Sequence, residues 1–172
     1  MNPNEELAAI ARTQLGTEED AAHTNKGAAI KKYQDETELS GTQGWPWCAA
    51  YVDWCVHRFI EKHPELKLKR PTAAAAFGLI DWGRANNCLV FTPSDTHHAP
   101  AVGDIVVFEF SHCGIVSAAP SKVKGYDFDS IEGNTNDDGS RDGYEVCERH
   151  RVEEGRHGVR AFIRIYSEGE KV

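Results

Sequence analysis

Apolar residues in the first half of the chain recur every three or four positions, which is the spacing of amphipathic helices. At the N-terminus, Leu7, Ile10, Ala11 and Leu15 lie on one such stripe, and Gly16 follows as a stop signal. Acidic residues occupy the opening turn, where the helix dipole favours them. This segment therefore predicts a first helix that runs up to the glycine.

Two further helices are predicted after a polar segment. Residues 17–44 are polar and contain glycine, which indicates surface loops with a short helix near 28–33. A helix should then run from Cys48 to just before Pro64, because five apolar residues fall at helical spacing: Val52, Cys55, Val56, Phe59 and Ile60. A third helix is predicted over residues 72–87, with its threonine as the N-cap.

After Pro100 the pattern changes to short β-branched runs separated by Gly, Pro, Asp and Asn. The predicted strands are DIVVF, HCGIVSA, DFDSI, YEVCERHRV and VRAFIRI. Helices followed by a meandering antiparallel sheet indicate the α+β class. A chain of 172 residues with 40% hydrophobic residues suits one domain, which we expect to span residues 1–172.

The chain carries 27 acidic and 19 basic residues, a formal charge of -8, which opposes non-specific binding to nucleic acid or anionic lipid. The N-terminus lacks the basic flank and apolar core of a signal peptide, so we expect synthesis in the cytoplasm without an export signal. No stretch approaches the roughly 20 apolar residues of a membrane span. The five cysteines are an odd number, and without a secretory signal they are expected to be reduced thiols.

The segment GWPWCAAYVDWCVHRF places Cys48 and Cys55 on one predicted helix. Seven residues of helix separate them by about 10.5 Å, whereas both sulfurs of a shared zinc site would lie about 2.3 Å from the metal. A shared metal is therefore excluded. Cys55 lies on the apolar stripe and is expected to be a core residue. Cys48 lies at the helix start, where unpaired N–H groups and the dipole favour a thiolate, although core packing is an equal alternative from position alone.

A nucleophilic cysteine requires a base, and His112 at the start of HCGIVSA is the candidate. Strand alternation places His112, Gly114 and Val116 on one face and Cys113 on the other, so His112 and Cys113 should not point into one site. Gly114 should leave room beside the imidazole for a helix or substrate. Five histidines lie in polar surroundings and are expected to be solvated: His23, His57, His63, His150 and His157.

A third signal is the segment IEGNTN, in which Glu132 and Asn134 are two residues apart and share a face if the backbone is extended. Either side chain could hold His112 in the required tautomer. The alternative interpretation is a solvated turn, because glycine and asparagine are ordinary loop residues.

Five segments occur in the order and approximate spacing of one known family: AIARTQLGTEE, WPWCAAYVDWC, PAVGDIVVFEF, HCGIV and IEGNTN. They resemble the CHAP family, the cysteine, histidine-dependent amidohydrolases and peptidases that cut peptidoglycan. The resemblance implies a papain-like core of N-terminal helices packed on an antiparallel sheet. It makes Cys48 the nucleophile, His112 its base, Glu132 the residue that orients His112, and Asn134 the fourth polar member. Trp47 would shape the substrate cleft or, alternatively, belong to the core.

The chain also departs from the family. Cys113 stands where members often have a small aliphatic residue, and the wall-binding module of many relatives has no counterpart in the sequence. The second departure leaves the target and the delivery route open.

Two metal sites compete with this interpretation. The segment from Asn134 to Glu145 fits the spacing of a calcium loop, with Asn134, Asn136, Asp138, Gly139 and Glu145 at positions 1, 3, 5, 6 and 12. Its first position should be Asp and its flanks look like strands, so a polar turn is favoured and we expect no cofactor. The adjacent His97 and His98, with a cysteine from elsewhere in the chain, are the ligands of an alternative zinc hydrolase, but the two histidines have no obvious orienting partner.

The expected reaction is acyl transfer to Cys48 from an amide of peptidoglycan, by an endopeptidase or an N-acetylmuramoyl-L-alanine amidase. The chemistry fits a phage endolysin released through a holin-type lesion, or an antibacterial effector delivered by a secretion system and matched by an inhibitor or immunity protein. The net negative charge argues against a freely diffusing lysin for an anionic wall. We expect a monomer that binds peptidoglycan and neither nucleic acid nor membrane. A catalytically silent wall-binding module is the main rival.

Overall fold

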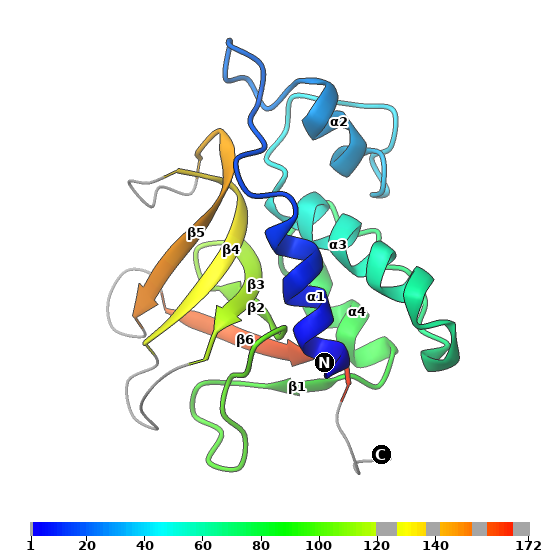
Figure 1. The fold of residues 1–172 in the computed structure, drawn as a ribbon, viewed down its shortest axis with the longest axis vertical. Coiled ribbons are helices and arrows are strands. Elements are labelled where there is room, and N and C mark those ends of the chain that lie inside the picture. The colour runs from blue at the N-terminus through cyan, green and yellow to red at the C-terminus, as the bar shows by residue number, and fades with distance from the viewer. Residues whose placement is uncertain (1, 120–126, 137–141, 153–157, 167–172) are drawn as a thin grey trace.

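In the computed structural model, helices cover one face of an antiparallel sheet (Figure 1). The structure describes residues 2–119, 127–136, 142–152 and 158–166. Its helices are α1 (Pro3–Arg12), α2 (Ala28–Gln34), α3 (Cys48–Lys62) and α4 (Gly78–Ala85), with a short 3₁₀ turn at Pro64–Leu66. None of the helices within the described ranges is long and apolar enough to span a membrane.

The sheet has six strands within the described residues: β1 (Leu89–Phe91), β2 (Ile105–Phe108), β3 (His112–Ala118), β4 (Asp127–Thr135), β5 (Glu145–Val152) and β6 (Val159–Arg164). Their order is β1-β6-β2-β3-β4-β5, and all neighbours are antiparallel. The α+β class is therefore confirmed. The sheet is not a simple meander, because β6 returns to pair with β2. Strand β1 forms one edge of the sheet and was not predicted, because a strand of three residues is too short to show a pattern.

The first helix begins as predicted but ends earlier. The Asn2 side chain accepts a hydrogen bond from the Asn4 N–H at 3.1 Å, and the Glu5 carboxylate caps the Asn2 N–H, which forms a capping box. The prediction that the helix reaches Gly16 is wrong, and Leu15 is exposed. The chain turns away because the Gly16 N–H donates to the Val146 carbonyl of β5 at 2.9 Å.

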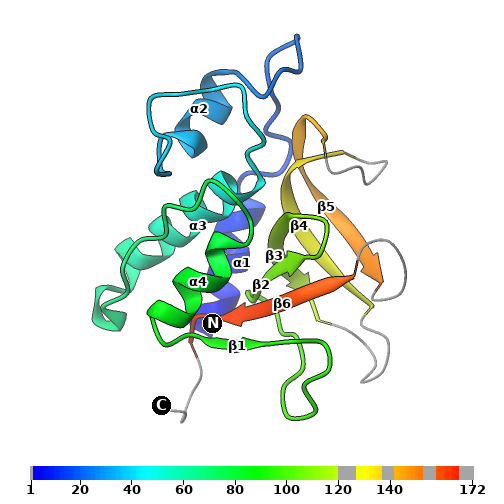
Figure 2. The ribbon, with the colours of Figure 1, turned by 180° about the vertical axis from the view of Figure 1, so that it is seen from behind.

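The helix predicted over residues 72–87 is shorter at its start, and Thr72 is not its N-cap. The Thr72 carbonyl accepts a hydrogen bond from the Glu38 N–H at 2.9 Å, so this segment is tied to the loop after α2 instead. The predicted exit is confirmed: Asn86 is the C-cap, and Asn87 has a left-handed backbone with φ of 55°. Figure 2 shows the resulting α4 lying against β1 and β6.

The core is divided by the sheet into two clusters. The larger cluster packs residues of α1, α3 and α4 against one face, including Leu7, Val52, Phe59, Ile115 and Ile163. The smaller cluster covers the other face and is rich in aromatic residues: Phe91, Val106, Phe108, Val116, Phe128, Val159 and Phe162. The central strand β2 is consequently buried on both faces.

The first turn of α3 lies directly on β4. A Cβ atom added to Gly133 would lie 2.7 Å from the Trp47 ring and 2.7 Å from the Tyr51 Cβ, closer than real atoms approach. Trp47 itself is fully buried, and its Nε1–H donates to Glu19 at 2.8 Å. The absence of a side chain at Gly133 therefore sets the height of the α3 N-terminus above the sheet.

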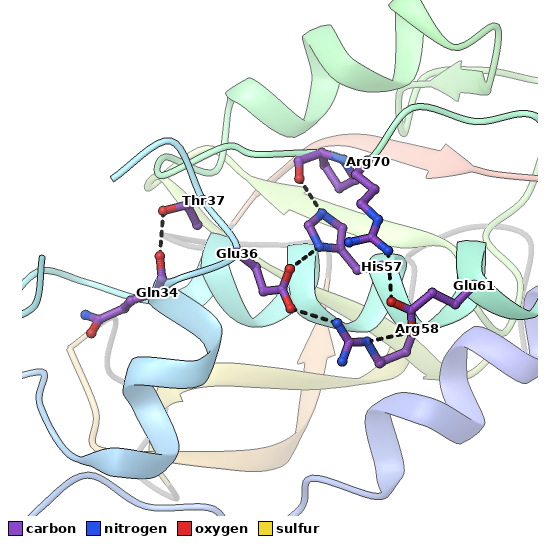
Figure 3. Close-up of polar contacts among 8 residues, drawn as sticks. Gln34, Glu36, Thr37, His57, Arg58, Glu61 and Arg70 are labelled. Atoms are coloured by element: carbon purple, nitrogen blue, oxygen red, sulfur yellow. Dashed lines mark hydrogen bonds and ion pairs between the residues drawn. The ribbon is translucent and has the colours of Figure 1, made fainter. Parts of the chain in front are cut away.

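A polar network fixes the segments that lead into and away from α3 (Figure 3). Glu36, after α2, interacts with His57 Nδ1 at 2.5 Å and accepts from Arg58 at 2.7 Å, while His57 Nε2 lies 2.6 Å from the Pro71 carbonyl. Gln34 donates to the Trp45 carbonyl at 3.0 Å. The prediction that His57 is solvated is wrong. Its ring extends from α3 and is buried against the segments that carry Glu36 and Pro71. His157 lies outside the described residues.

We predict that Gly133→Ala lowers the free energy of unfolding by about 1–3 kcal/mol, the usual cost of overpacking. The added methyl group would meet Trp47 and Tyr51, neither of which can move without lifting α3. Gly158→Ala is the matched control, because its nearest neighbour would be a flexible glutamate carbon at 3.8 Å. Urea unfolding measures both, and equal stability of the two variants would contradict the close contact.

Candidate active site

Cys48 is the first residue of α3 and is almost completely buried, with 6% of its surface exposed. At this position the backbone N–H groups of the first turn have no acceptor within the helix, and the Ala49 N–H hydrogen-bonds the Cys48 sulfur. The side chains of His112 and Cys113, at the start of β3, also interact with this sulfur. The structure thus brings together Cys48 and the histidine predicted from the sequence.

His112 and Glu132 form a hydrogen bond in the interior. His112 Nε2 lies 2.8 Å from Glu132 Oε2, and both side chains are fully buried. A carboxylate only accepts, so Nε2 carries the hydrogen. The other ring nitrogen, Nδ1, has no standard hydrogen bond within the described residues and is the atom left for Cys48. This contact is looser than a standard hydrogen bond, as is common in sites without substrate.

Glu132 has two further partners that the sequence did not reveal. Arg151 donates from Nε to Oε1 at 2.8 Å and from Nη2 to Oε2 at 2.5 Å, and Ser130 donates to Oε1 at 2.6 Å. Arg151 lies on β5, far from Glu132 in the sequence, so the sequence alone does not show that these two residues pair. The only available signal was general: a carboxylate on a buried strand needs a cation.

The room provided by Gly114 is taken by Glu132, not by a helix or substrate as predicted. A Cβ atom at Gly114 would lie 2.6 Å from the Glu132 Cγ and 2.8 Å from the Ile131 carbonyl oxygen. The glycine therefore allows the carboxylate to cross β3 and reach His112.

The three central groups have shifted pKa values. The neighbouring Cys113 thiol, together with the positive charge of His112, holds the pKa of Cys48 well below its usual value, although burial opposes this. Burial also opposes ionisation of His112, but the charge of Cys48 and the contact with Glu132 raise its pKa to about 9. Burial likewise acts against ionised Glu132, yet Arg151 and His112 lower its pKa to about 2. These shifts favour a thiolate at Cys48, an imidazolium at His112 and a carboxylate at Glu132.

Cys113 contributes to this site, contrary to the prediction from strand alternation. Its side chain belongs to the helix-side cluster, whereas Gly114 faces Glu132, so the alternation itself is correct. Cys48 lies where β3 begins and interacts with both His112 and Cys113. Burial and the neighbouring Cys48 raise the pKa of the Cys113 thiol well above its usual value, which favours the protonated form of Cys113 beside Cys48.

The prediction that Asn134 shares a face with Glu132 required an extended backbone at Asn134, and the structure does not have one. Its φ is 57°, and the register of β4 against β5 shifts between Glu132 and Thr135, so the backbone is not extended there. The residue is buried, and its carbonyl accepts from the Gly143 N–H at 3.1 Å. A shared face with Glu132 cannot be derived from alternation, and the role of Asn134 stays a prediction.

Trp47 and Cys55 both lie in the core. Trp47 is fully buried and stacks on Tyr33 with ring centroids 5.8 Å apart, which agrees with the core alternative and not with a cleft wall. Cys55 is also fully buried, as predicted, and burial raises the pKa of its thiol. Of the two cysteines on α3, only Cys48 has the surroundings of a nucleophile.

The candidate metal sites find no support in the described residues, which contain no group of three or more His, Cys, Asp and Glu side chains that could hold a metal ion. His98 pairs with Asp95 at 3.1 Å, and the His97 N–H donates to the same carboxylate. Of the calcium-loop positions, Asp138 and Gly139 lie outside the described residues. The segments that flank this loop are strands β4 and β5.

Comparison with known proteins identifies the sequence family. A family model described as CHAP domain matches residues 40–134, more than half of the chain and the part that contains Cys48, His112 and Glu132. Neither the curated proteins nor the solved structures gave a match. The resemblance inferred from the five sequence segments is confirmed.

We predict that Cys113→Val raises the pH at which Cys48 becomes reactive towards iodoacetamide, because the variant lacks the neighbouring thiol that lowers the pKa of Cys48. Cys113→Ser keeps a donor and should restore much of the difference. Cys55→Val is the control, since it changes another buried thiol of the same cluster. Alkylation of the Cys48 peptide, followed by mass spectrometry across a pH series, measures the effect. Identical profiles for the valine and wild-type proteins would contradict this effect of Cys113 on Cys48.

Proposed function

The chain belongs to the CHAP family, whose members are amidases and peptidases of peptidoglycan, and from this premise we propose that it hydrolyses an amide bond of the stem peptide or cross-bridge with Cys48 as the nucleophile. One observation carries the proposal. Cys48 at the α3 N-terminus faces His112, and His112 in turn contacts buried Glu132 at 2.8 Å. A nucleophile, a base and an orienting carboxylate are the parts that thiol acyl transfer requires.

The resting protonation state simplifies the first step. Because the proton already resides on His112, the Cys48 sulfur attacks the amide carbonyl carbon directly and forms a tetrahedral intermediate. The C–N bond then breaks, and the imidazolium gives its proton to the departing amine. Water, deprotonated by neutral His112, then attacks the thioester carbonyl, and the C–S bond breaks to release the acid and restore the Cys48 thiolate beside the His112 imidazolium.

The oxyanion would be held at the start of α3. The Cys48 N–H is one of the first helical N–H groups, which have no intrahelical acceptor, and it adjoins the attacked carbonyl. The helix dipole adds a favourable potential for negative charge at the same place.

Two rival functions explain less of the site. A silent wall-binding module would not need the ionised groups of His112, Glu132 and Arg151 in the interior, where charges are costly to bury. A zinc hydrolase built on His97 and His98 would need further ligands, and the described residues supply no such cluster.

We predict that wild-type protein clears a suspension of bacterial cell walls and that Cys48→Ser does not, because a serine hydroxyl remains protonated beside His112. Cys55→Ser should retain most of the activity of the folded protein, since Cys55 is a core residue. Turbidity measures both, with circular dichroism to verify folding. Loss of lysis in the Cys55 variant alone would refute the assignment.

The same assay separates the thiol mechanism from the metal alternatives. Lysis should survive EDTA and be lost after iodoacetamide treatment. Inactivation by EDTA that zinc reverses would contradict the thiol mechanism, and recovery with calcium alone would support the loop from Asn134 to Glu145 as a calcium site.

For the bond cleaved, we propose endopeptidase activity, because the groove that a papain-like core implies would accommodate an extended peptide better than a branched glycan. We expect mass spectrometry of the digested wall to find glycan strands that still bear truncated stem peptides. Glycan chains with free lactyl groups and intact released stems would instead show an amidase.

A further inference from the structure

Arg151 binds the Glu132 carboxylate with both arms of its guanidinium group. The distances are 2.8 Å from Nε to Oε1 and 2.5 Å from Nη2 to Oε2. Both residues are buried, with 5% of Arg151 and none of Glu132 exposed. The guanidinium carbon also lies 5.0 Å from the ring centre of Phe108 and 5.8 Å from that of Phe110. The arginine is thus fixed by aromatic rings as well as by the carboxylate.

This geometry determines where Glu132 points. Oε1 accepts from Arg151 and Ser130, while Oε2 accepts from Arg151 and His112. A two-point contact with a planar guanidinium fixes the plane of the carboxylate. Oε2 is therefore held towards His112 before any substrate binds, and the imidazole ring is held with Nδ1 left for Cys48.

The same contact balances the charge of the site. The Cys48 thiolate and the Glu132 carboxylate carry two negative charges, and the His112 imidazolium and Arg151 carry two positive ones. Without Arg151 this buried group would carry a net negative charge, which is costly in the interior. The site would then take up a proton, on Cys48 or on Glu132, and either event weakens the thiolate–imidazolium pair.

We propose that Arg151 is a positioning residue: through Glu132 it fixes the His112 ring, and its charge allows Cys48 to remain a thiolate near an ionised carboxylate. The proposal rests on the proposed function in taking Cys48 as the nucleophile. Arg151 acts on the chemistry indirectly, since its described contacts are with Glu132 and the aromatic rings.

Other titratable groups near Glu132 do not replace this charge. Among the described residues, those that interact with it or lie opposite it on neighbouring elements are His112 and Cys113 of β3, Arg151 and Cys147 of β5, and Tyr51 of α3. Burial raises the pKa of Tyr51 and that of Cys113 well above their usual values, so both are neutral near pH 7. A thiol or a phenol cannot supply a positive charge in any case.

The experiment compares the pH dependence of Cys48 alkylation by iodoacetamide in wild type and in Arg151→Met, Arg151→Gln and Arg151→Lys. Met and Gln remove the charge, and Gln keeps a hydrogen-bond donor should the Met variant fail to fold. Both should shift the midpoint upwards by about one pH unit, which makes alkylation about tenfold slower at a pH below both midpoints. Arg151→Lys keeps the positive charge but loses the two-point contact of the guanidinium, so its upward shift of the alkylation midpoint should be smaller.

Arg164→Met is the matched control. Arg164 forms a second two-point pair, with Asp104 at 2.8 and 2.7 Å, and its guanidinium carbon lies 5.4 Å from the Phe91 ring centre. Asp104 precedes β2 at the end away from Phe108 and His112. Arg164→Met should lower the thermal stability and leave the pH midpoint of Cys48 alkylation at its wild-type value.

Folded Met and Gln variants with the wild-type midpoint would overturn the proposal, as would an equal shift in Arg164→Met. Alkylation requires no cell wall, so the two hypotheses can fail separately. A shifted midpoint in a protein that never lyses walls would refute the proposed function and leave the role of Arg151 supported. Wall lysis by the wild-type protein, with an unshifted midpoint in the Arg151 variants, would support the proposed function and refute the role of Arg151.

Discussion

The buried carboxylate of Glu132 is the constraint on which the arrangement of the site depends. A carboxylate without exposure is unstable unless its lone pairs are filled and its charge is balanced. Three strands meet this demand: β3 contributes His112, β4 Ser130 and β5 Arg151. The pairing of these strands is therefore coupled to the chemistry, because a shift of register in either pair would leave the carboxylate without its counter-charge.

The helix end alone does not explain the thiolate. A helix N-terminus stabilises a negative charge by about 0.3–1 kcal/mol at an exposed site, and Cys48 is buried, which acts against ionisation. The Cys113 thiol and the charge of His112 favour ionisation of Cys48. The helix supplies position more than charge: Gly133 lets its first turn approach the sheet, and this places the sulfur beside the two side chains that stabilise it.

Features fixed by local periodicity were predictable, whereas those fixed by tertiary hydrogen bonds were not. The full span of α3 and the start of β3 at His112 follow from the apolar pattern. The early end of α1 depends on a bond from Gly16 to Val146. In the site, a cysteine at a helix start and a histidine in a strand are visible in the sequence. Arg151 is not, because its contact with Glu132 depends on how β4 and β5 pair.

The pairs Arg151–Glu132 and Arg164–Asp104 show how one local structure can serve stability or chemistry. In each pair, a buried carboxylate accepts both arms of a guanidinium packed on an aromatic ring. They differ in the other groups that the carboxylate contacts. Asp104 accepts the Ala101 N–H at 2.8 Å and fixes a turn, whereas Glu132 accepts the ring N–H of His112. A backbone amide does not titrate near neutral pH and an imidazole does, so only the second pair controls a proton that a bond-breaking step can use.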